Sequence, residues 1–509
     1  MVVLEENTLS YTAWEYYAIV LIVLIAYYVI PKKYRWFALL VGSIYFYTQL
    51  IYRLRQIAIF LVSIFVSYIT AIIIEEISNR AQKGKTKEKT KRTREIEKSK
   101  LLKYIVLWIG IVFTALPLLL EKFGGFLFGS VIHRPTLPLI IPVGLSFYTL
   151  QLVAYVVDVY HGKIKAQRNP LKFGLFASFF PQIIQGPIPR YEKLENQLFD
   201  GNKYDFNNIV SGLQLVLWGF FLKYMIADKS AVIVNTVFDN YNAYSGGYIW
   251  LAAILYSIQL YTDFLSCTTM SQGVAEMFGI HLDNNFERPY FSTSIKEFWR
   301  RWHMSLSLWL KDYIYIPLGG NRRGTFRKWI NLLITFAVSG IWHGGSWKFL
   351  FWGLLHAVYQ ITGEIRIKIK DKFNIHDIGL NDCVRRILSQ VLTFFFVMIA
   401  WIIFRADSFR GAVAMIKSMF TSFNPWIWVD DSVFKLGLNW KECAILVISM
   451  LILFIVSKMQ EEGKHIRSII SDQNIVIRWS IYLIVIWLIW ICGSYGFGFD
   501  AKDFIYGGF

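Results

Sequence analysis

Long apolar runs recur along the whole chain, and short segments rich in Lys and Arg separate them. Of the 509 residues, 55% are hydrophobic, and the mean hydropathy is +0.42. Both values are far above those of ordinary soluble proteins. We therefore predict an all-α polytopic membrane protein with roughly ten or more spanning, broken and re-entrant helices.

The formal net charge of +18 is by itself compatible with nucleic-acid binding. However, the basic residues lie in short segments between apolar runs and form no basic soluble domain, so we interpret them as topology signals and expect no nucleic-acid partner. The four cysteines show no C-x-x-C or His-adjacent spacing. Neither a disulfide framework nor a metal site is predicted.

Two basic segments, Lys32-Lys33 and Arg80 to Lys103, interrupt the predicted spans of the N-terminal region. Because Lys and Arg are enriched in cytoplasmic loops, both segments are expected inside the cell and the N-terminus outside. We expect the first apolar run to remain as a transmembrane helix, because no N-terminal segment combines a basic region with a cleavage site of small residues. The predicted spans are 14–30, 36–49, 56–74 and 103–121.

Prolines and glycines punctuate the middle of the chain, where Pro135, Pro138 and Pro142 precede apolar runs too short to cross a bilayer cleanly. Such runs predict short or re-entrant helices, which are stable at membrane depth only where protein or a polar cavity covers the backbone. Gln182 and Gln185 are candidates for the lining of that cavity, although the sequence favours a structural role for each of them.

The C-terminal half contains further apolar runs and no internal repeat of fixed period. Asp263 is a single carboxylate near the end of one run, and without a partner carboxylate nearby we interpret it as a structural hydrogen-bond acceptor. We expect an interfacial segment at 409–420. The predicted spans are 209–227, 249–265, 387–404, 442–457 and 477–492.

The first of two Trp-His pairs, Trp302-His303, lies in a segment with apolar residues at helical spacing. Arg300 and Lys311 lie on the opposite side of the helical wheel, and His303 lies at the border. The pattern predicts one amphipathic helix at the membrane interface. Its apolar face would consist of Ile295, Phe298, Trp299, Trp302, Leu306, Trp309 and Tyr313.

The second pair, Trp342-His343, lies in the apolar run 329–362, which contains no acidic residue. A straight helix of that length would exceed a hydrocarbon core of about 30 Å, so we expect bends at Ser339-Gly340 and Gly344-Gly345. His343 would then lie about 20 Å into the bilayer. An ionisable group at that depth is costly and tends to face a polar cavity or another polar group. The break flanked by glycines and the presence of a second Trp-His pair favour a functional histidine over a hydrogen-bonded core residue.

The sequence resembles the membrane-bound O-acyltransferase family. Two segments carry most of the likeness, NFERPYFSTSIKEFWRRWHMSLSLWLKDYIYIPLGGNRRG and SGIWHGGSWKFLFWGLLHA, and FFPQIIQGPI and GLSFYTLQLVAYVVDVY add to it. Within the family, YIPLGGNRRG and the tail FIYGGF are similar to the branch of alginate O-acetyltransferases. That branch often has a second aspartate shortly after the position of Asp263, where this chain has Cys267-Thr268-Thr269.

The resemblance implies a helical body around a central funnel or tunnel, with His343 and His303 matching the family's two histidines. Acyl transfer to a hydroxyl needs a base, and a neutral imidazole suits that work. His303 is a candidate oxyanion donor or a structural residue. We expect a tunnel lined by Trp342, Trp299, Trp302, Ser339, Gln182, Gln185 and Asp263. The candidates for binding the donor's phosphates are Arg300, Arg301, Lys311, Arg322 and Arg323.

The resemblance also implies acetyl-CoA or another acyl thioester as the cytoplasmic donor, with no tightly bound cofactor. An exported cell-envelope polysaccharide would be the acceptor, an extracytoplasmic SGNH-hydrolase-type protein the partner, and the bacterial cell membrane the location. We expect a single domain, 1–509, with N-terminal spans (1–135) that include a basic loop (79–103), a catalytic core (136–365) and C-terminal spans (366–509). Three alternatives are D-alanyl transfer to teichoic acid, a His-lined transporter or channel, and a membrane scaffold.

Overall fold

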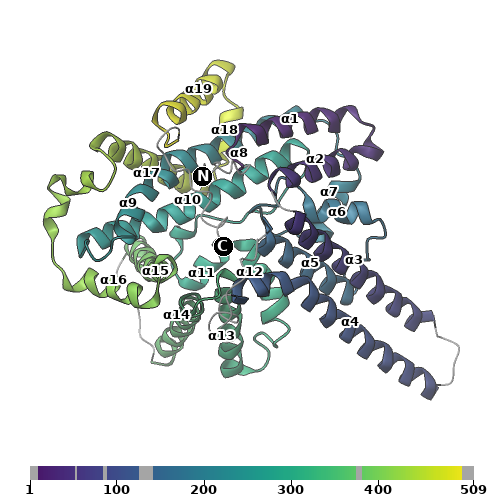
Figure 1. Cartoon of the computed structure of the whole chain (residues 1–509). Helices are drawn as coiled ribbons and strands as arrows, with labels where there is room; N and C mark the ends of the chain where they lie inside the picture. The colour runs from purple at the N-terminus through teal and green to yellow at the C-terminus, as the bar shows by residue number, and fades with distance from the viewer. Residues whose placement is uncertain (1–9, 52–53, 84–88, 125–141, 374–380, 496–509) are drawn as a thin grey trace, which may run out of the picture. The chain divides into compact units, whose positions relative to one another are not determined.

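The computed structural model describes residues 10–51, 54–83, 89–124, 142–373 and 381–495, and all the regular elements in these ranges are helices (Figure 1). The contacts divide the chain into two compact units. The first unit contains residues 1–213 and 271–283, and the second contains 214–270 and 284–509. The single domain with three parts described above stays a prediction.

The first unit is built around three helices, α3, α4 and α5, which pack against one another. Figure 1 shows α3 and α4 running side by side over most of their length. Helix α2 packs against both α1 and α6. The helices of this unit are α1 (Trp14–Val29), α2 (Arg35–Gln49), α3 (Leu54–Lys83), α4 (Lys89–Gly124), α5 (Leu145–Tyr160), α6 (Pro170–Ser178) and α7 (Tyr191–Phe199).

The second unit contains a tight helical hairpin, α13 and α14, against which α11 and α15 pack. Its helices are α9 (Asp228–Phe238), α11 (Ile295–Arg301), α12 (Met304–Leu310), α13 (Gly324–His343), α14 (Trp347–Lys372), α15 (Asp382–Arg405), α16 (Phe409–Thr421), α17 (Trp440–Glu461), α18 (Ile466–Ser471) and α19 (Ile475–Cys492). Two helices, α8 (Phe206–Phe221) and α10 (Gly247–Met277), have residues in both units.

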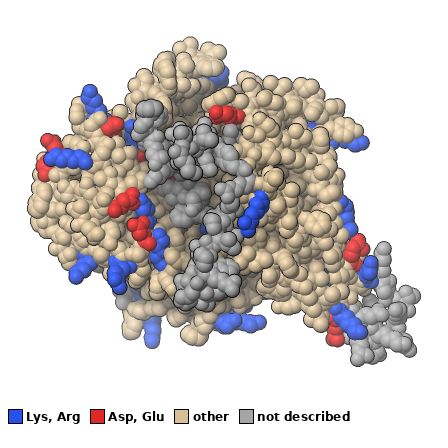
Figure 2. All heavy atoms as spheres, viewed as in Figure 1, with Lys and Arg blue, Asp and Glu red and all other residues tan. Residues whose placement is uncertain are grey.

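Seven helices in the described part of the chain are long and apolar enough to cross a membrane. They are Leu54–Ala81, Ile96–Lys122, Phe206–Phe238, Gly247–Met277, Asp382–Arg405, Trp440–Glu461 and Ile475–Cys492. Figure 2 shows a face on which charged residues are sparse and scattered. No residue of α19 is buried. The prediction of an all-α membrane protein is confirmed.

The predicted basic loop between Arg80 and Lys103 is largely helical, so that prediction is wrong. Helix α3 continues to Lys83 and α4 begins at Lys89, while residues 84–88 lie outside the described part. Lys, Arg and Glu are good helix formers. Both helices can therefore continue beyond the apolar residues. Pro135, Pro138 and the aromatic tail also lie outside the described part.

The predicted single interfacial helix is also wrong, because the chain breaks at Trp302-His303 between α11 and α12. His303 adopts a left-handed backbone with φ +42°, which is uncommon for a residue other than glycine. Asn285 satisfies the backbone there: its carbonyl accepts from the Met304 amide at 2.9 Å, and its side-chain oxygen accepts from Ser305 at 3.2 Å. This tertiary contact takes the place of helical hydrogen bonds.

Helix α13 runs unbroken through Ser339-Gly340 and ends at His343, so only the predicted bend at Gly344-Gly345 is confirmed. Gly340 has a packing role instead. A Cβ atom there would lie 2.2 Å from the Phe349 carbonyl oxygen, and one on Gly353 would lie 2.2 Å from that of Phe336. These two glycines let α13 and α14 approach closely enough for their backbones to touch.

Candidate functional site

His343 is the last residue of α13 and is enclosed by aromatic rings. Its ring centroid lies 4.8 Å from that of Trp342, 5.1 Å from that of Trp352 and 5.3 Å from that of Phe404. Only 3% of the residue is exposed. The helix end therefore places the imidazole inside the protein in a predominantly aromatic environment.

His303 lies near His343, although 40 residues separate them in the sequence. Its ring packs edge-on against Phe264 at 4.8 Å and lies 6.1 Å from Trp342. Trp342 thus contacts both histidines. Burial lowers the pKa of His303 to about 3, which keeps its imidazole neutral.

A third histidine, His356, lies on α14 in the same aromatic cluster. The indole N–H of Trp299 donates to its Nδ1 at 3.2 Å. The ring of Trp352 lies 5.1 Å from that of His356 and 5.1 Å from that of His343. Trp352 therefore connects these two histidines on the hairpin, as Trp342 connects His343 with His303.

Four polar groups of this hairpin are buried and have no hydrogen-bond partner within the part of the chain that the structure describes. They are the side-chain oxygen of Asn331, the hydroxyl of Ser339, the indole N–H of Trp352 and Nε2 of His356. Each residue is at most 1% exposed. A buried polar group without a partner costs about 1–3 kcal/mol, so such a group needs an explanation.

Two of the tryptophans predicted to line a tunnel have different surroundings. Trp299 contacts Phe336 and Trp352 as well as His356, and so belongs to the cluster of histidines. Trp302 is stacked on Phe298 at 5.3 Å and lies 4.9 Å from Trp401. It is 1% exposed and is packed as a core residue.

Asp263 has charged neighbours that the sequence analysis did not find. Nζ of Lys223 lies 2.7 Å from Asp263 and 3.0 Å from Asp228, and all three residues are buried. A π-helical turn at Leu222–Ala227 joins α8 to α9 and carries the lysine. The expectation that Asp263 has no carboxylate nearby is wrong, since Asp228 shares its lysine.

The basic residues predicted to bind a donor fall into two groups. Arg301 is paired within the protein: it lies 2.8 Å from Glu297 and 2.9 Å from Glu461. The hydrogen bonds that Arg301 donates to Glu461 raise the pKa of its guanidinium. The other four, Arg300, Lys311, Arg322 and Arg323, are exposed and open to an external anion.

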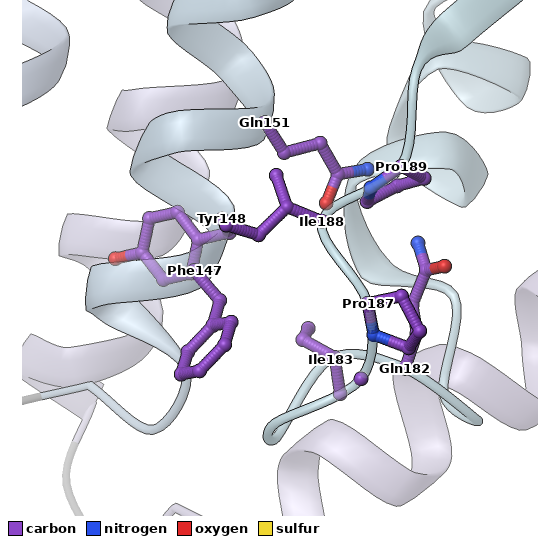
Figure 3. Close-up of a pocket in the computed structure, with 9 residues that line it drawn as sticks. Phe147, Tyr148, Gln151, Gln182, Ile183, Pro187, Ile188 and Pro189 are labelled. Carbon is purple, nitrogen blue, oxygen red and sulfur yellow. The ribbon is translucent and has the colours of Figure 1, made fainter. Parts of the chain in front are cut away.

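Gln182 and Gln185 belong to the first unit, on the loop that follows α6. Both are buried, and both amides lack hydrogen-bond partners among the described residues. A cavity of about 10 Å³, the space of roughly one water molecule, lies beside Gln182. Figure 3 shows Phe147 and Tyr148, from α5, on one side of it and Ile183 and Pro187, from the loop, on the other.

A wider cavity of about 220 Å³ lies beside the start of α7. Arg190, Lys193 and His281 line it, and so does Asp283. Lys193 lies 2.8 Å from both carboxylate oxygens of Asp283, so its charge is largely balanced within the protein. Among the described residues, no group of three or more His, Cys, Asp or Glu is arranged to hold a metal ion.

Four polar residues of the second unit were missed as candidates from the sequence, namely Lys223, Asp228, Trp352 and His356. A usable signal existed for Lys223, because a lysine inside an apolar run indicates a buried partner. His356 follows Trp352 by four residues, a spacing that places both on one helix face. The hydrogen-bonding state of these two residues depends on contacts that spacing does not reveal.

Residues 164–409 match the model of the MBOAT, membrane-bound O-acyltransferase family. A probable alginate O-acetylase from Azotobacter vinelandii is 39% identical over 293 residues, which cover 57% of this chain and 56% of that protein. A peptidoglycan O-acetyltransferase from Helicobacter pylori is 36% identical over 313 residues, 56% of this chain and 58% of its own length.

A teichoic acid D-alanyltransferase from Bacillus subtilis is 30% identical over 313 residues, which cover 59% of this chain and 78% of that protein. The matches to the alginate and peptidoglycan proteins are higher in identity but span little more than half of those relatives. His303, His343 and His356, together with the tryptophans Trp299, Trp342 and Trp352 that contact them, form the cluster of histidines. All of them lie inside the range that matches the family.

Proposed function

Because the chain belongs to the membrane-bound O-acyltransferase family, we propose that it moves an acetyl group from a cytoplasmic thioester across the membrane towards an exported cell-envelope polysaccharide. The observation that carries this proposal is the buried pair of histidines, His343 and His303, on either side of Trp342. A single well-placed base is what transfer to a hydroxyl requires.

In the proposed reaction, His343 is the general base. Its imidazole takes the proton of the acceptor hydroxyl while that oxygen attacks the thioester carbonyl carbon. The intermediate then collapses, the C–S bond breaks, and the imidazolium returns the proton to the thiolate. The aromatic rings that enclose His343 would exclude bulk water and so protect the thioester from hydrolysis. His303, which is neutral, would orient the substrate or donate a hydrogen bond to it.

The donor in this proposal is acetyl-CoA or a similar acyl thioester. The exposed residues Arg300, Lys311, Arg322 and Arg323 are proposed to contact its phosphates, since arginine and lysine both bind phosphate well. Arg301 is a weaker candidate, because Glu297 and Glu461 already hold it. Trp342, Trp299 and Ser339 would line the path of the acyl group, and Trp302 and Asp263 would support it. The lining role of Gln182 and Gln185, which belong to the first unit, stays a prediction from the sequence.

Two relatives are named for acetylation of alginate and of peptidoglycan, and both names refer to polysaccharides outside the cytoplasm. This supports an exported polysaccharide as the acceptor. An extracytoplasmic SGNH-hydrolase-type partner would complete the transfer, and the bacterial cell membrane would be the location. A funnel or tunnel within the helical body would let the acyl group cross.

The direct test replaces His343 by Gln and measures O-acetyl ester on envelope polysaccharide. Glutamine keeps hydrogen-bonding capacity but cannot take a proton, so transfer should fall by about 10²–10⁴-fold at normal protein level. The matched variant is His465→Gln, at an exposed histidine before α18, which should transfer normally. Near-normal acetylation by His343→Gln would show that the base is another group.

A second candidate function is D-alanyl transfer to teichoic acid. It is favoured by the match that covers 78% of the teichoic acid D-alanyltransferase of Bacillus subtilis. Mass spectrometry of the ester-linked groups released from the envelope separates the two, because acetate and D-alanine differ in mass and charge.

One observation, a set of buried ion pairs, favours the alternative function of a transporter. A carrier that couples to protons should contain paired charges inside the membrane, and Lys223 with Asp263 and Asp228 is such a set. A carrier predicts a change in flux when His343 is replaced, with O-acetylation unaffected.

A further inference from the structure

The hydrogen bond between Trp299 and His356 determines where the proton of His356 lies. An indole nitrogen can only donate, so Nδ1 of His356 must be the acceptor and carries no proton. The neutral imidazole therefore carries its proton on Nε2. This N–H has no acceptor within the described part of the chain, although the residue is fully buried.

Trp352 presents a second donor of the same kind on the same helix face. It precedes His356 by one helical turn, and its indole N–H is also buried without an acceptor among the described residues. Its ring contacts both His343 and His356 at 5.1 Å. Both N–H groups without an acceptor therefore lie close to the proposed base: Trp352 contacts His343 directly, and His356 contacts Trp352.

We propose that the N–H groups of Trp352 and His356 form the oxyanion site of the acyl transfer and donate hydrogen bonds to the acyl carbonyl oxygen. This inference rests on the proposed function and goes beyond it, because it assigns the charge-stabilising step to α14. Donors that are already oriented and shielded from water stabilise developing negative charge strongly. The missing acceptor is then the substrate itself.

The chemistry balances with these groups alone. As the acceptor oxygen forms its bond to the carbonyl carbon, the carbonyl π electrons move to the carbonyl oxygen, and His343 takes the hydroxyl proton. Trp352 and His356 hold the resulting oxyanion and keep their own protons. When the C–S bond breaks, the electrons return to form the carbonyl, and the thiolate takes the proton from His343.

The competing explanation is that Trp352 and His356 only fill space in the aromatic cluster. Phenylalanine is smaller than tryptophan as well as lacking the N–H, so a packing role predicts that Trp352→Phe lowers the stability of the protein without a selective fall in kcat. Kinetics separate the two explanations, because losing an interaction made only in the transition state lowers kcat with little change in KM.

The experiment measures kcat and KM for the acyl donor in membranes that contain the full-length protein. Trp352→Phe and His356→Phe should each lower kcat by about 10²–10³-fold, the usual effect of losing one oxyanion donor. His356→Gln retains an N–H donor and should recover part of that loss. The matched control is Trp250→Phe, which removes the hydrogen bond from its indole to the Met419 carbonyl elsewhere in the unit. Its kcat should stay within about twofold of the wild-type value.

Trp299→Phe tests the tautomer. Without the indole donor, Nδ1 and Nε2 compete for the proton, so kcat should fall less than in His356→Phe.

Normal kcat in Trp352→Phe and in His356→Phe would overturn the oxyanion assignment. If the wild-type protein transfers acyl groups and these variants do as well, only this inference fails. If the wild-type protein transfers none, the proposed function fails with it.

Discussion

Lys223 lies in an apolar span and is held between Asp228 and Asp263. A buried ion pair adds little net stability compared with apolar residues, but breaking it leaves a charge without compensation. One lysine between two carboxylates makes this cluster especially sensitive to loss of the cation. Its position also links it to the proposed site, since Asp263 directly precedes Phe264, whose ring packs on His303.

We predict that Lys223→Met destabilises the protein by about 3–5 kcal/mol, because two carboxylates then remain in an apolar span without a cation. The measurement is the thermal midpoint of the detergent-solubilised protein. Lys223→Met combined with Asp228→Asn and Asp263→Asn should recover most of the loss. Lys435→Met, at an exposed lysine, is the control and should leave the midpoint unchanged. An unchanged midpoint in Lys223→Met would show that the cluster does not hold the helices together.

At the scale of helices, the α13–α14 hairpin positions the cluster of histidines. Backbone contact at Gly340 and Gly353 brings the two helices together, and the chain reverses directly after His343. Residues 342 and 343 of one helix and 352 and 356 of the other contribute to the cluster. A small increase in the spacing of these helices would therefore disturb several contacts at once.

Gly353→Ala should separate the hairpin, because the new Cβ would lie 2.2 Å from the Phe336 carbonyl oxygen, a backbone atom that cannot move alone. We expect a loss of at least tenfold in acyl transfer and a lower thermal midpoint. Gly363→Ala is the matched control on the same helix, where the added Cβ meets nothing within 4 Å.

Alanine has a higher helix propensity than glycine, so Gly363→Ala should be neutral or slightly stabilising. Equal behaviour of the two variants would contradict a role for close packing at Gly353. A large loss in both variants would point to a general intolerance of α14 to substitution.

For the whole molecule, the sidedness of the membrane remains a prediction. We predict that the basic segments at Lys32-Lys33 and between Arg80 and Lys103 both lie on the cytoplasmic side and that the N-terminus lies outside. In a variant without its four native cysteines, Gln82→Cys should resist a membrane-impermeant thiol reagent in intact cells and react after permeabilisation. Thr12→Cys is the companion position before α1 and should react in intact cells. The reverse pattern would overturn the orientation.

Much of the helical order was predictable from the sequence because its causes are local. An apolar run of sufficient length becomes a helix wherever it meets lipid, so α15, α17 and α19 appear close to where they were expected. The bend after His343 was predictable for the same reason, since Gly344-Gly345 cannot favour a continuous helix. The depth of His343 in a bilayer, which was counted along that helix, stays a prediction.

The tertiary structure alone decided how these helices present their polar groups. The predicted interfacial helix is interrupted at His303, where Asn285 accepts a hydrogen bond from the Met304 amide. Lys223 forms an ion pair with Asp263, which lies 40 residues away in the sequence. Trp299 sets the tautomer of His356 across 57 residues. Hydrogen bonds and ion pairs need donor and acceptor within about 3 Å, and a periodic pattern carries no information about distances between helices. The amino-acid sequence therefore determined which residues enter the membrane, and packing determined which of them meet.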